Sequence, residues 1–244
     1  PIIKCENQYF YRNKLEFSFT DNRWLTNEEI SNSGTDLERR GVGFHISGMW
    51  DKVVDINKCH LQPDPSNQIR LSIKDFAINN NISFHNSRSK KGLLRGIMIR
   101  NTSLDQFMVI VLFFENDINS IELILNHLKN NFKQLSSIQY IINNKGNDSI
   151  YDQEINLFHG KEYIEEMIGE LKFKIFPKSF FQTNTNQTIK LYQVVKDLAD
   201  LKGNEIVYDL YSGLGTITQF LAKEANKIIG IESIDEAVIS AQES

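Results

Sequence analysis

Hydrophobic and polar positions in the first two thirds of the chain follow the pattern of strands more often than that of helices. Aromatic and charged residues nearly alternate over 9–20, which predicts a half-buried strand, and another strand is expected over 42–50 after the break at Gly41. Two apolar runs, 94–101 and 107–114, predict a hairpin. The same reasoning predicts strands over 137–143 and 171–176 and helices over 67–80 and 118–131.

The pattern changes after Pro177. Apolar residues recur at helical spacing over 185–201, and Thr185 is the expected N-cap of that helix. A strand, a glycine-containing turn, a helix, a strand and a helix are then expected over 205–210, 211–215, 216–225, 227–232 and 234–243. This order is typical of the start of a doubly wound parallel sheet. We therefore expect a mixed α/β and α+β chain, with a β-rich central domain over 1–178 and a Rossmann-like domain over 179–244.

The turn over 211–215 carries the pattern that is most informative about chemistry. Gly213 and Gly215 allow a tight turn and a close approach to a ligand, and the next helix begins with free N–H groups that suit an anion. Glu232 ends the following strand, where an acid accepts the ribose hydroxyls of an adenosine-containing cofactor. A dinucleotide fingerprint needs a third glycine where this chain has Thr218. S-adenosylmethionine is therefore favoured, and an NAD-linked oxidoreductase is disfavoured.

Several motifs together resemble the RNA uracil-5-methyltransferase family, whose members use S-adenosylmethionine to make 5-methyluridine in ribosomal or transfer RNA. The motifs lie at 180–184, 209–216 and 230–232 and, upstream, at 11–17 and 55–61. The resemblance covers nearly the whole chain and implies that 179–244 is the first part of a class I methyltransferase domain. It also implies a set of cofactor-binding residues, namely Gln182, Tyr211, Gly213, Gly215, Thr216 and Glu232.

The resemblance implies catalytic groups that this sequence does not contain. Methylation at C5 of uracil needs a thiolate that adds to C6 and a base that removes the C5 proton. In the family both lie beyond the second strand of the methyltransferase sheet, whereas this chain has no cysteine after Cys59. We therefore expect no catalytic residue here, and an inactive fragment of a longer enzyme. Cys59 matches one ligand of the family's 4Fe-4S cluster, so a cluster is expected only in the full-length parent.

The local distribution of charge, rather than the net charge, indicates where RNA could bind. The net charge is −4, so bulk charge does not favour nucleic acid. However, the stretch from Phe76 to Leu104 contains no acid and several bases. From this stretch we predict RNA contacts by Arg88, Lys90, Lys91 and Arg95. The alternative is a solvated loop in which the charges cluster by chance.

The remaining predictions concern location and assembly. Two cysteines fit a reducing compartment, the apolar runs are strand-sized, and the first residues lack a signal pattern, so a cytoplasmic protein without a membrane segment is expected. An unpaired edge on the strands at 205–210 and 227–232 predicts that 205–244 is poorly ordered or pairs with a second copy. A non-catalytic RNA-binding module and a class I methyltransferase with another substrate are the alternative functions. The sequence leaves open whether the substrate is ribosomal or transfer RNA.

Overall fold

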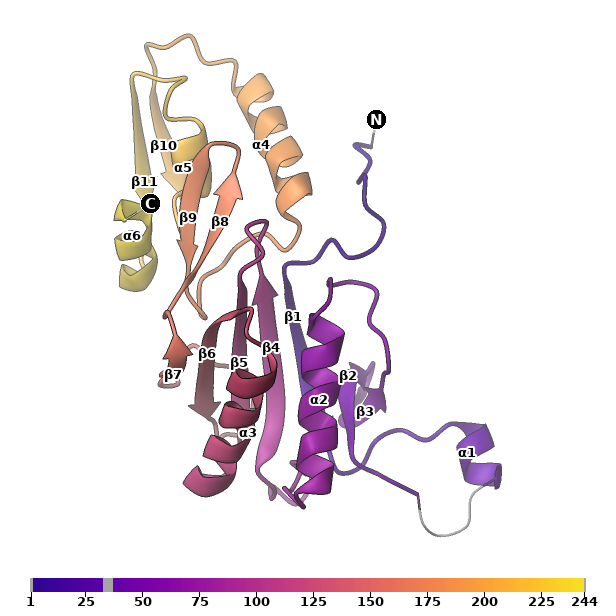
Figure 1. Ribbon diagram of the computed structural model, residues 1–244. Coiled ribbons are helices and arrows are strands. Elements are labelled where there is room, and N and C mark those ends of the chain that lie inside the picture. The colour runs from indigo at the N-terminus through magenta and orange to yellow at the C-terminus, as the bar shows by residue number, and fades with distance from the viewer. Residues whose placement is uncertain (1, 33–36, 244) are drawn as a thin grey trace. The chain divides into compact units, whose positions relative to one another are not determined.

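The chain folds into two compact units, which we call the central unit and the split unit (Figure 1). The computed structural model describes residues 2–32 and 37–243. The central unit comprises 14–100 and 107–161, and the described part of the split unit comprises 2–13, 101–106 and 162–243. The units divide after 161 rather than at 178, because the hairpin formed by β8 (Ile164–Ile168) and β9 (Leu171–Ile175) contacts the helices of the C-terminal region.

A seven-stranded sheet forms the central unit. Strand β1 (Lys14–Thr20) lies near its middle and pairs antiparallel with β2 and β4, whereas β5 and β6 are parallel. The spatial order is β3 (Met49–Asp55), β2 (Gly41–Ile46), β1, β4 (Leu94–Asn101), β5 (Phe107–Phe113), β6 (Leu135–Ile142) and β7 (Asn156–Gly160).

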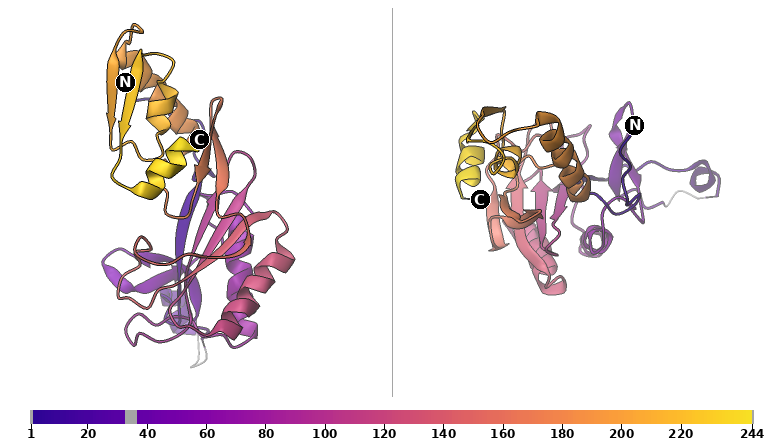
Figure 2. Two further views of the ribbon diagram at one scale, coloured as in Figure 1. Left: turned by 90° about the vertical axis from the view of Figure 1, so that its left-hand side faces the viewer. Right: turned by 90° about the horizontal axis from the view of Figure 1, so that it is seen from above.

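Helices α2 (Ser66–Asn79) and α3 (Ile118–Asn131) lie on the same side of this sheet (Figures 1 and 2). Apolar residues at helical spacing point from both helices into the core, among them Ile73 and Leu125, which are fully buried. A short helix, α1 (Asn27–Asn32), precedes β2. The core therefore lies between the helices and one face of the sheet, as expected for an amphipathic helix packed on strands.

The predictions for this unit hold for the helices and the hairpin strands and fail at two places. The expected strand over 42–50 is two strands, β2 and β3, because Gly48 adopts φ +78 and turns the chain between them. The strand expected over 9–20 begins only at Lys14. Strand β7 and helix α1 were not predicted, and both are short and largely exposed, so they lack a strong periodic pattern.

The split unit contains α4 (Thr185–Ala199) followed by the predicted strand, helix, strand and helix. These are β10 (Ile206–Leu210), α5 (Thr216–Phe220), β11 (Lys227–Ile231) and α6 (Asp235–Gln242). Strands β10 and β11 are parallel, as predicted. The N-cap of α4 is Asn184 rather than Thr185, because the Asn184 side chain accepts the Gln187 N–H at 3.0 Å. No helix among the described residues is long and apolar enough to cross a membrane.

Candidate functional site

The turn between β10 and α5 has an unusual backbone at three positions. Tyr211, Gly213 and Gly215 all have positive φ angles, of +62, +56 and +69. The Tyr211 side chain is 92% exposed, so no packing in the split unit accounts for its left-handed conformation. Ser212 N donates to the Ile231 carbonyl at 3.1 Å, which fixes this turn to the end of β11. The turn therefore carries an exposed tyrosine ring on a backbone that is hydrogen-bonded to β11.

Glu232 follows β11 and faces the turn. Its Oε2 accepts the Gly213 N–H at 2.9 Å, and its Oε1 accepts the N–H groups of Ser233 and Ile234 at 2.6 and 2.9 Å. The backbone N–H groups of Ile234, Gly213 and Ser233 lower the pKa of the carboxyl below its ordinary value. Glu232 is thus an oriented carboxylate at the carboxyl end of a parallel strand, where ligands bind in open α/β sheets.

A cavity of about 210 Å³ adjoins the turn. Gln182 lines it from the segment before α4, Tyr192 from α4, and Asp209 from the end of β10. The Tyr192 hydroxyl and Thr216 Oγ1 are 2.7 Å apart, and burial raises the pKa of Tyr192. Tyr211, Gly213 and Thr216 line the same cavity, so the structure brings four of the six predicted cofactor residues to one hollow. The other two predicted residues lie next to this cavity. Glu232 accepts a hydrogen bond from Gly213, which lines the cavity, and Gly215 is the N-cap residue of α5.

Two residues named in the sequence analysis have structural roles at this site that the sequence did not predict. Thr218, which stands where a third glycine would be, donates from its hydroxyl to Asp209 at 2.6 Å. Gly230 lies inside β11, and a Cβ there would be 3.0 Å from Ser212 Oγ and 3.1 Å from Thr218 Oγ1. A glycine inside a strand is the signal that could have indicated this close approach.

A buried carboxylate holds the segment that carries Gln182. Glu166 accepts from Ser103 N at 3.0 Å and Met167 N at 2.9 Å, and from the hydroxyls of Ser103 and Thr185. Asn13, in the predicted motif at 11–17, donates to Thr185 Oγ1 at 3.0 Å and to the Gln182 carbonyl at 2.8 Å. This polar network joins all three segments of the split unit around the start of α4.

The predicted RNA-binding residues Arg88, Lys90 and Lys91 lie on one structured turn of the central unit. The Asn86 side chain holds the turn by accepting the N–H groups of Arg88 and Ser89 at 3.0 and 2.8 Å. Lys90 has φ +54 and donates its N–H to the Asn86 carbonyl at 2.8 Å. The three cationic side chains are exposed. We call residues 86–91 the basic turn.

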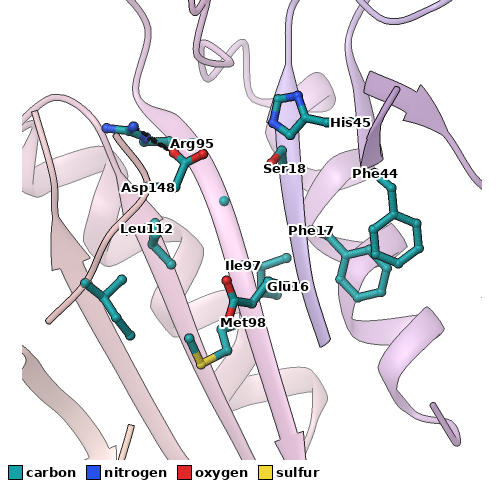
Figure 3. Close-up of a pocket in the computed structure, with 13 residues that line it drawn as sticks. Glu16, Phe17, Ser18, Phe44, His45, Arg95, Ile97, Met98, Leu112 and Asp148 are labelled. Atoms are coloured by element: carbon teal, nitrogen blue, oxygen red, sulfur yellow. Dashed lines mark hydrogen bonds and ion pairs between the residues drawn. The ribbon is translucent and has the colours of Figure 1, made fainter. Parts of the chain in front are cut away.

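Arg95, the fourth predicted RNA-binding residue, lies outside the basic turn. It is only 7% exposed and donates to the carbonyls of Asn143, Lys145 and Asn147 at 2.6–2.8 Å and to Asp148 at 2.7 and 3.0 Å. Figure 3 shows the Arg95–Asp148 pair at the rim of a second cavity of about 210 Å³. Because its donors hold the loop that follows β6, the structure does not support Arg95 as a phosphate ligand.

The cysteines of the described region do not form a metal centre by themselves. Cys59 is buried, and its backbone bonds the Asn67 side chain at 2.7 and 3.1 Å. Within residues 2–32 and 37–243, no group of three or more His, Cys, Asp or Glu side chains lies close enough to hold a metal ion. One thiolate does not hold a four-iron cluster. The expectation of a cluster in a longer protein therefore stays a prediction.

The chain is similar to several known proteins. No family model matches it. An RNA methyltransferase of Porphyromonas gingivalis is 46% identical over 99% of the chain and 53% of its own length, and one of Bacteroides thetaiotaomicron is 43% identical over 99% and 54%. The Pyrococcus abyssi tRNA (uracil-54, C5)-methyltransferase, solved with S-adenosyl-L-homocysteine, is 28% identical with a TM-score of 0.74, over 98% of this chain and 53% of that one.

The chain thus spans about half the length of the curated relatives it matches. Within that half, the likeness to the solved structure covers 98% of the chain and therefore extends over both compact units. The fold is that of a β-rich part followed by the first part of a class I methyltransferase domain, as predicted. Over that half, the chain is similar in sequence to RNA methyltransferases and in fold to a tRNA (uracil-54, C5)-methyltransferase.

Proposed function

We propose that the chain supplies the cofactor-binding and RNA-binding parts of an S-adenosylmethionine-dependent enzyme that methylates C5 of a uridine in ribosomal or transfer RNA. The observation that carries the proposal is the Glu232 carboxylate, which the Gly213 N–H fixes beside the turn. The Pyrococcus abyssi enzyme supports the choice of cofactor and of uracil, because it is a tRNA (uracil-54, C5)-methyltransferase and its structure contains the demethylated cofactor, S-adenosyl-L-homocysteine.

The residues around the turn fit this cofactor. Open space surrounds the position of a Cβ on Gly213, so a ligand can approach the backbone there. Glu232 is the acceptor for two ribose hydroxyls, and Tyr211 offers an exposed ring beside it. Gln182 and Thr216 add polar groups to the adjoining cavity, and Gly215 gives the turn its shape. When bound, the cofactor supplies an electrophilic methyl group, and these residues bind and orient it.

Two measurements test the proposal. Titration calorimetry of the chain is expected to detect S-adenosylmethionine binding, with NAD as the comparison ligand. A polypeptide of the relatives' full length that includes this chain is expected to transfer tritiated methyl groups to C5 of uridine in unmodified RNA. Absence of cofactor binding by the chain would contradict the site, and label at another base would contradict the substrate.

The basic turn is the proposed phosphate-binding surface. Reversing two of its charges in a Lys90→Glu and Lys91→Glu variant is expected to weaken RNA binding. It should also reduce the slope of log affinity against log salt by about 0.7–0.9 for each lost phosphate contact. Filter binding over a range of salt concentrations measures both effects. The control is a Lys129→Glu and Lys133→Glu variant, which has the same net charge but changes exposed residues near the end of α3. Equal slopes in the two variants would make the turn an ordinary solvated loop.

We further propose that the chain pairs with a second copy through the unpaired edge of the β10–β11 sheet. Ile206, Tyr208 and Leu210 alternate along β10, and all three side chains are exposed. Exposed apolar residues on a short two-stranded sheet recruit another strand or surface. Sedimentation at increasing concentration is expected to show dimers that an Ile206→Lys and Leu210→Lys variant lacks. A monomer at every concentration would refute the pairing.

A further inference from the structure

The outermost strand of the central sheet, β3, carries a bulge. Val53 lies opposite His45 and Met49 lies opposite Ile46 on the neighbouring strand β2. His45 and Ile46 are consecutive on β2, whereas Val53 and Met49 are four residues apart on β3. Residues 50–52 of β3 therefore have no residues opposite them on β2. Bulges on edge strands redirect side chains and occur often beside binding sites.

An exposed aromatic surface lies at this bulge. The Trp50 side chain is 65% exposed, and the neighbouring Met49 is also exposed. Tryptophan is one of the side chains most often buried in a core or an interface, so a bulge that directs one into solvent needs an explanation. An unpaired nucleobase stacks well on such a ring, because every base has a flat π-face.

The bulge is joined to the basic turn. Asp51, next to Trp50, forms an ion pair with Arg88 through the Nε atom of the guanidinium. The Arg88 side chain remains 69% exposed, so it stays accessible to a ligand. Lys52, also in the bulge, is partly exposed. Lys52, two residues from Trp50, and Arg88, which pairs with the neighbouring Asp51, thus place cationic groups at the same bulge as the aromatic residue. Single-stranded nucleic acid binds to such combinations of aromatic and cationic residues.

We propose that Trp50 is a stacking platform for an unpaired base of the RNA, with Arg88 and Lys52 binding the phosphates next to that base. The proposal rests on the proposed RNA-binding function and assigns that function a single-stranded ligand. Asp51 is a positioning residue, because its ion pair holds the Arg88 guanidinium beside the bulge. Duplex RNA keeps its bases stacked inside the helix and offers no ring to Trp50.

The chain has only two tryptophans, so stacking on one of them can be followed by tryptophan fluorescence once the other is replaced. Trp24 lies beside the same strand, since its N–H donates to the Val53 carbonyl at 2.8 Å, and it is also exposed. In a Trp24→Phe variant of the whole chain, Trp50 is the only tryptophan. Its fluorescence is expected to be quenched saturably by an unstructured oligouridylate and not by an RNA duplex. In the matched Trp50→Phe variant, Trp24 fluorescence is expected to stay unchanged although the oligouridylate binds.

Affinity separates stacking from simple hydrophobic contact. Trp50→Leu is expected to weaken oligouridylate binding about five- to a hundredfold, whereas Trp50→Phe, which keeps a ring, should retain most of the affinity. Neither variant should change the salt dependence, because neither removes a phosphate contact. Circular dichroism spectra that match the unmodified chain would show that both variants fold.

The outcomes are distinct from those of the RNA-binding proposal itself. If the basic-turn variant loses RNA binding while Trp50→Leu does not, the stacking platform is wrong and the RNA-binding surface stands. If the unmodified chain binds no RNA, both the RNA-binding proposal and the stacking platform are wrong. If Trp50→Leu instead abolishes dimer formation in sedimentation and leaves RNA affinity unchanged, Trp50 belongs to a contact between copies and the proposal is overturned.

Discussion

Replacing Glu166 by alanine is expected to lower the free energy of unfolding of the split unit by about 1–3 kcal/mol. The carboxylate is 1% exposed and accepts hydrogen bonds from two backbone N–H groups and two hydroxyls. Removing it leaves the Ser103 and Met167 N–H groups without this acceptor. Hydrogen exchange at these two amides measures the effect directly, because their protection depends on the bonds to Glu166.

Glu170 provides the matched control for this experiment. It lies in the turn of the same β8–β9 hairpin, and its side chain is 93% exposed. Glu170→Ala removes the same group and is expected to change the unfolding free energy by less than about 0.5 kcal/mol. Glu166→Gln, which keeps an acceptor oxygen, should fall between the two. Unchanged exchange at Ser103 and Met167 in Glu166→Ala would show that the network does not hold the segment before α4.

Replacing Glu232 by alanine is expected to weaken S-adenosylmethionine binding about ten- to a hundredfold. The substitution removes the charged acceptor for the ribose and also releases the Gly213 N–H that shapes the turn. Glu236→Ala, an exposed acid in α6, changes the net charge equally and should leave affinity unchanged. Calorimetry on the two variants makes the comparison, and equal affinities would remove Glu232 from the site.

The pH dependence of the same interaction has a definite sign. Backbone N–H groups lower the pKa of Glu232 in the folded chain below its ordinary value of 4.5. The carboxylate and the affinity that it provides are therefore fully present above the ordinary value, and are lost only as pH falls through the lowered one. Cofactor affinity should stay constant from neutral pH down to about 5. A decline centred above that value would assign the titration to another group.

Local patterns were enough to predict the elements with strong periodicity. Helix α3 was predicted from apolar residues at helical spacing, and Ile121, Leu125 and Leu128 are all fully buried. The turn around Gly213 was predicted because glycines, a preceding acid and a following strand occur within one short segment. In both cases the residues that decide the structure are close together in the sequence.

The remaining features depend on residues that are far apart in the sequence. Arg95 looked like a member of the basic cluster, but Asp148 and the carbonyls of the loop after β6 take up its donors. The role of Asn13 depends on Gln182, which lies 169 residues further along the chain. Thr185 bonds Glu166, and Asn184 caps the helix in its place, a choice between two adjacent cap residues that propensity does not resolve.

The order in which the chain is synthesised gives the split unit a particular route of assembly. Lys14 pairs with Arg100 in the central sheet, and next to this pair the Asn101 N–H bonds the Asn13 carbonyl at 3.0 Å. Folding of the central unit on the ribosome therefore brings together 2–13 and 101–106, two of the three segments of the split unit, before the third is complete. Until 162–243 is synthesised, the Asn13 side chain lacks its partners Gln182 and Thr185. Because the long loop between 2–13 and 101–106 is already closed, docking of Glu166 and α4 costs less chain entropy than assembly from an unfolded chain.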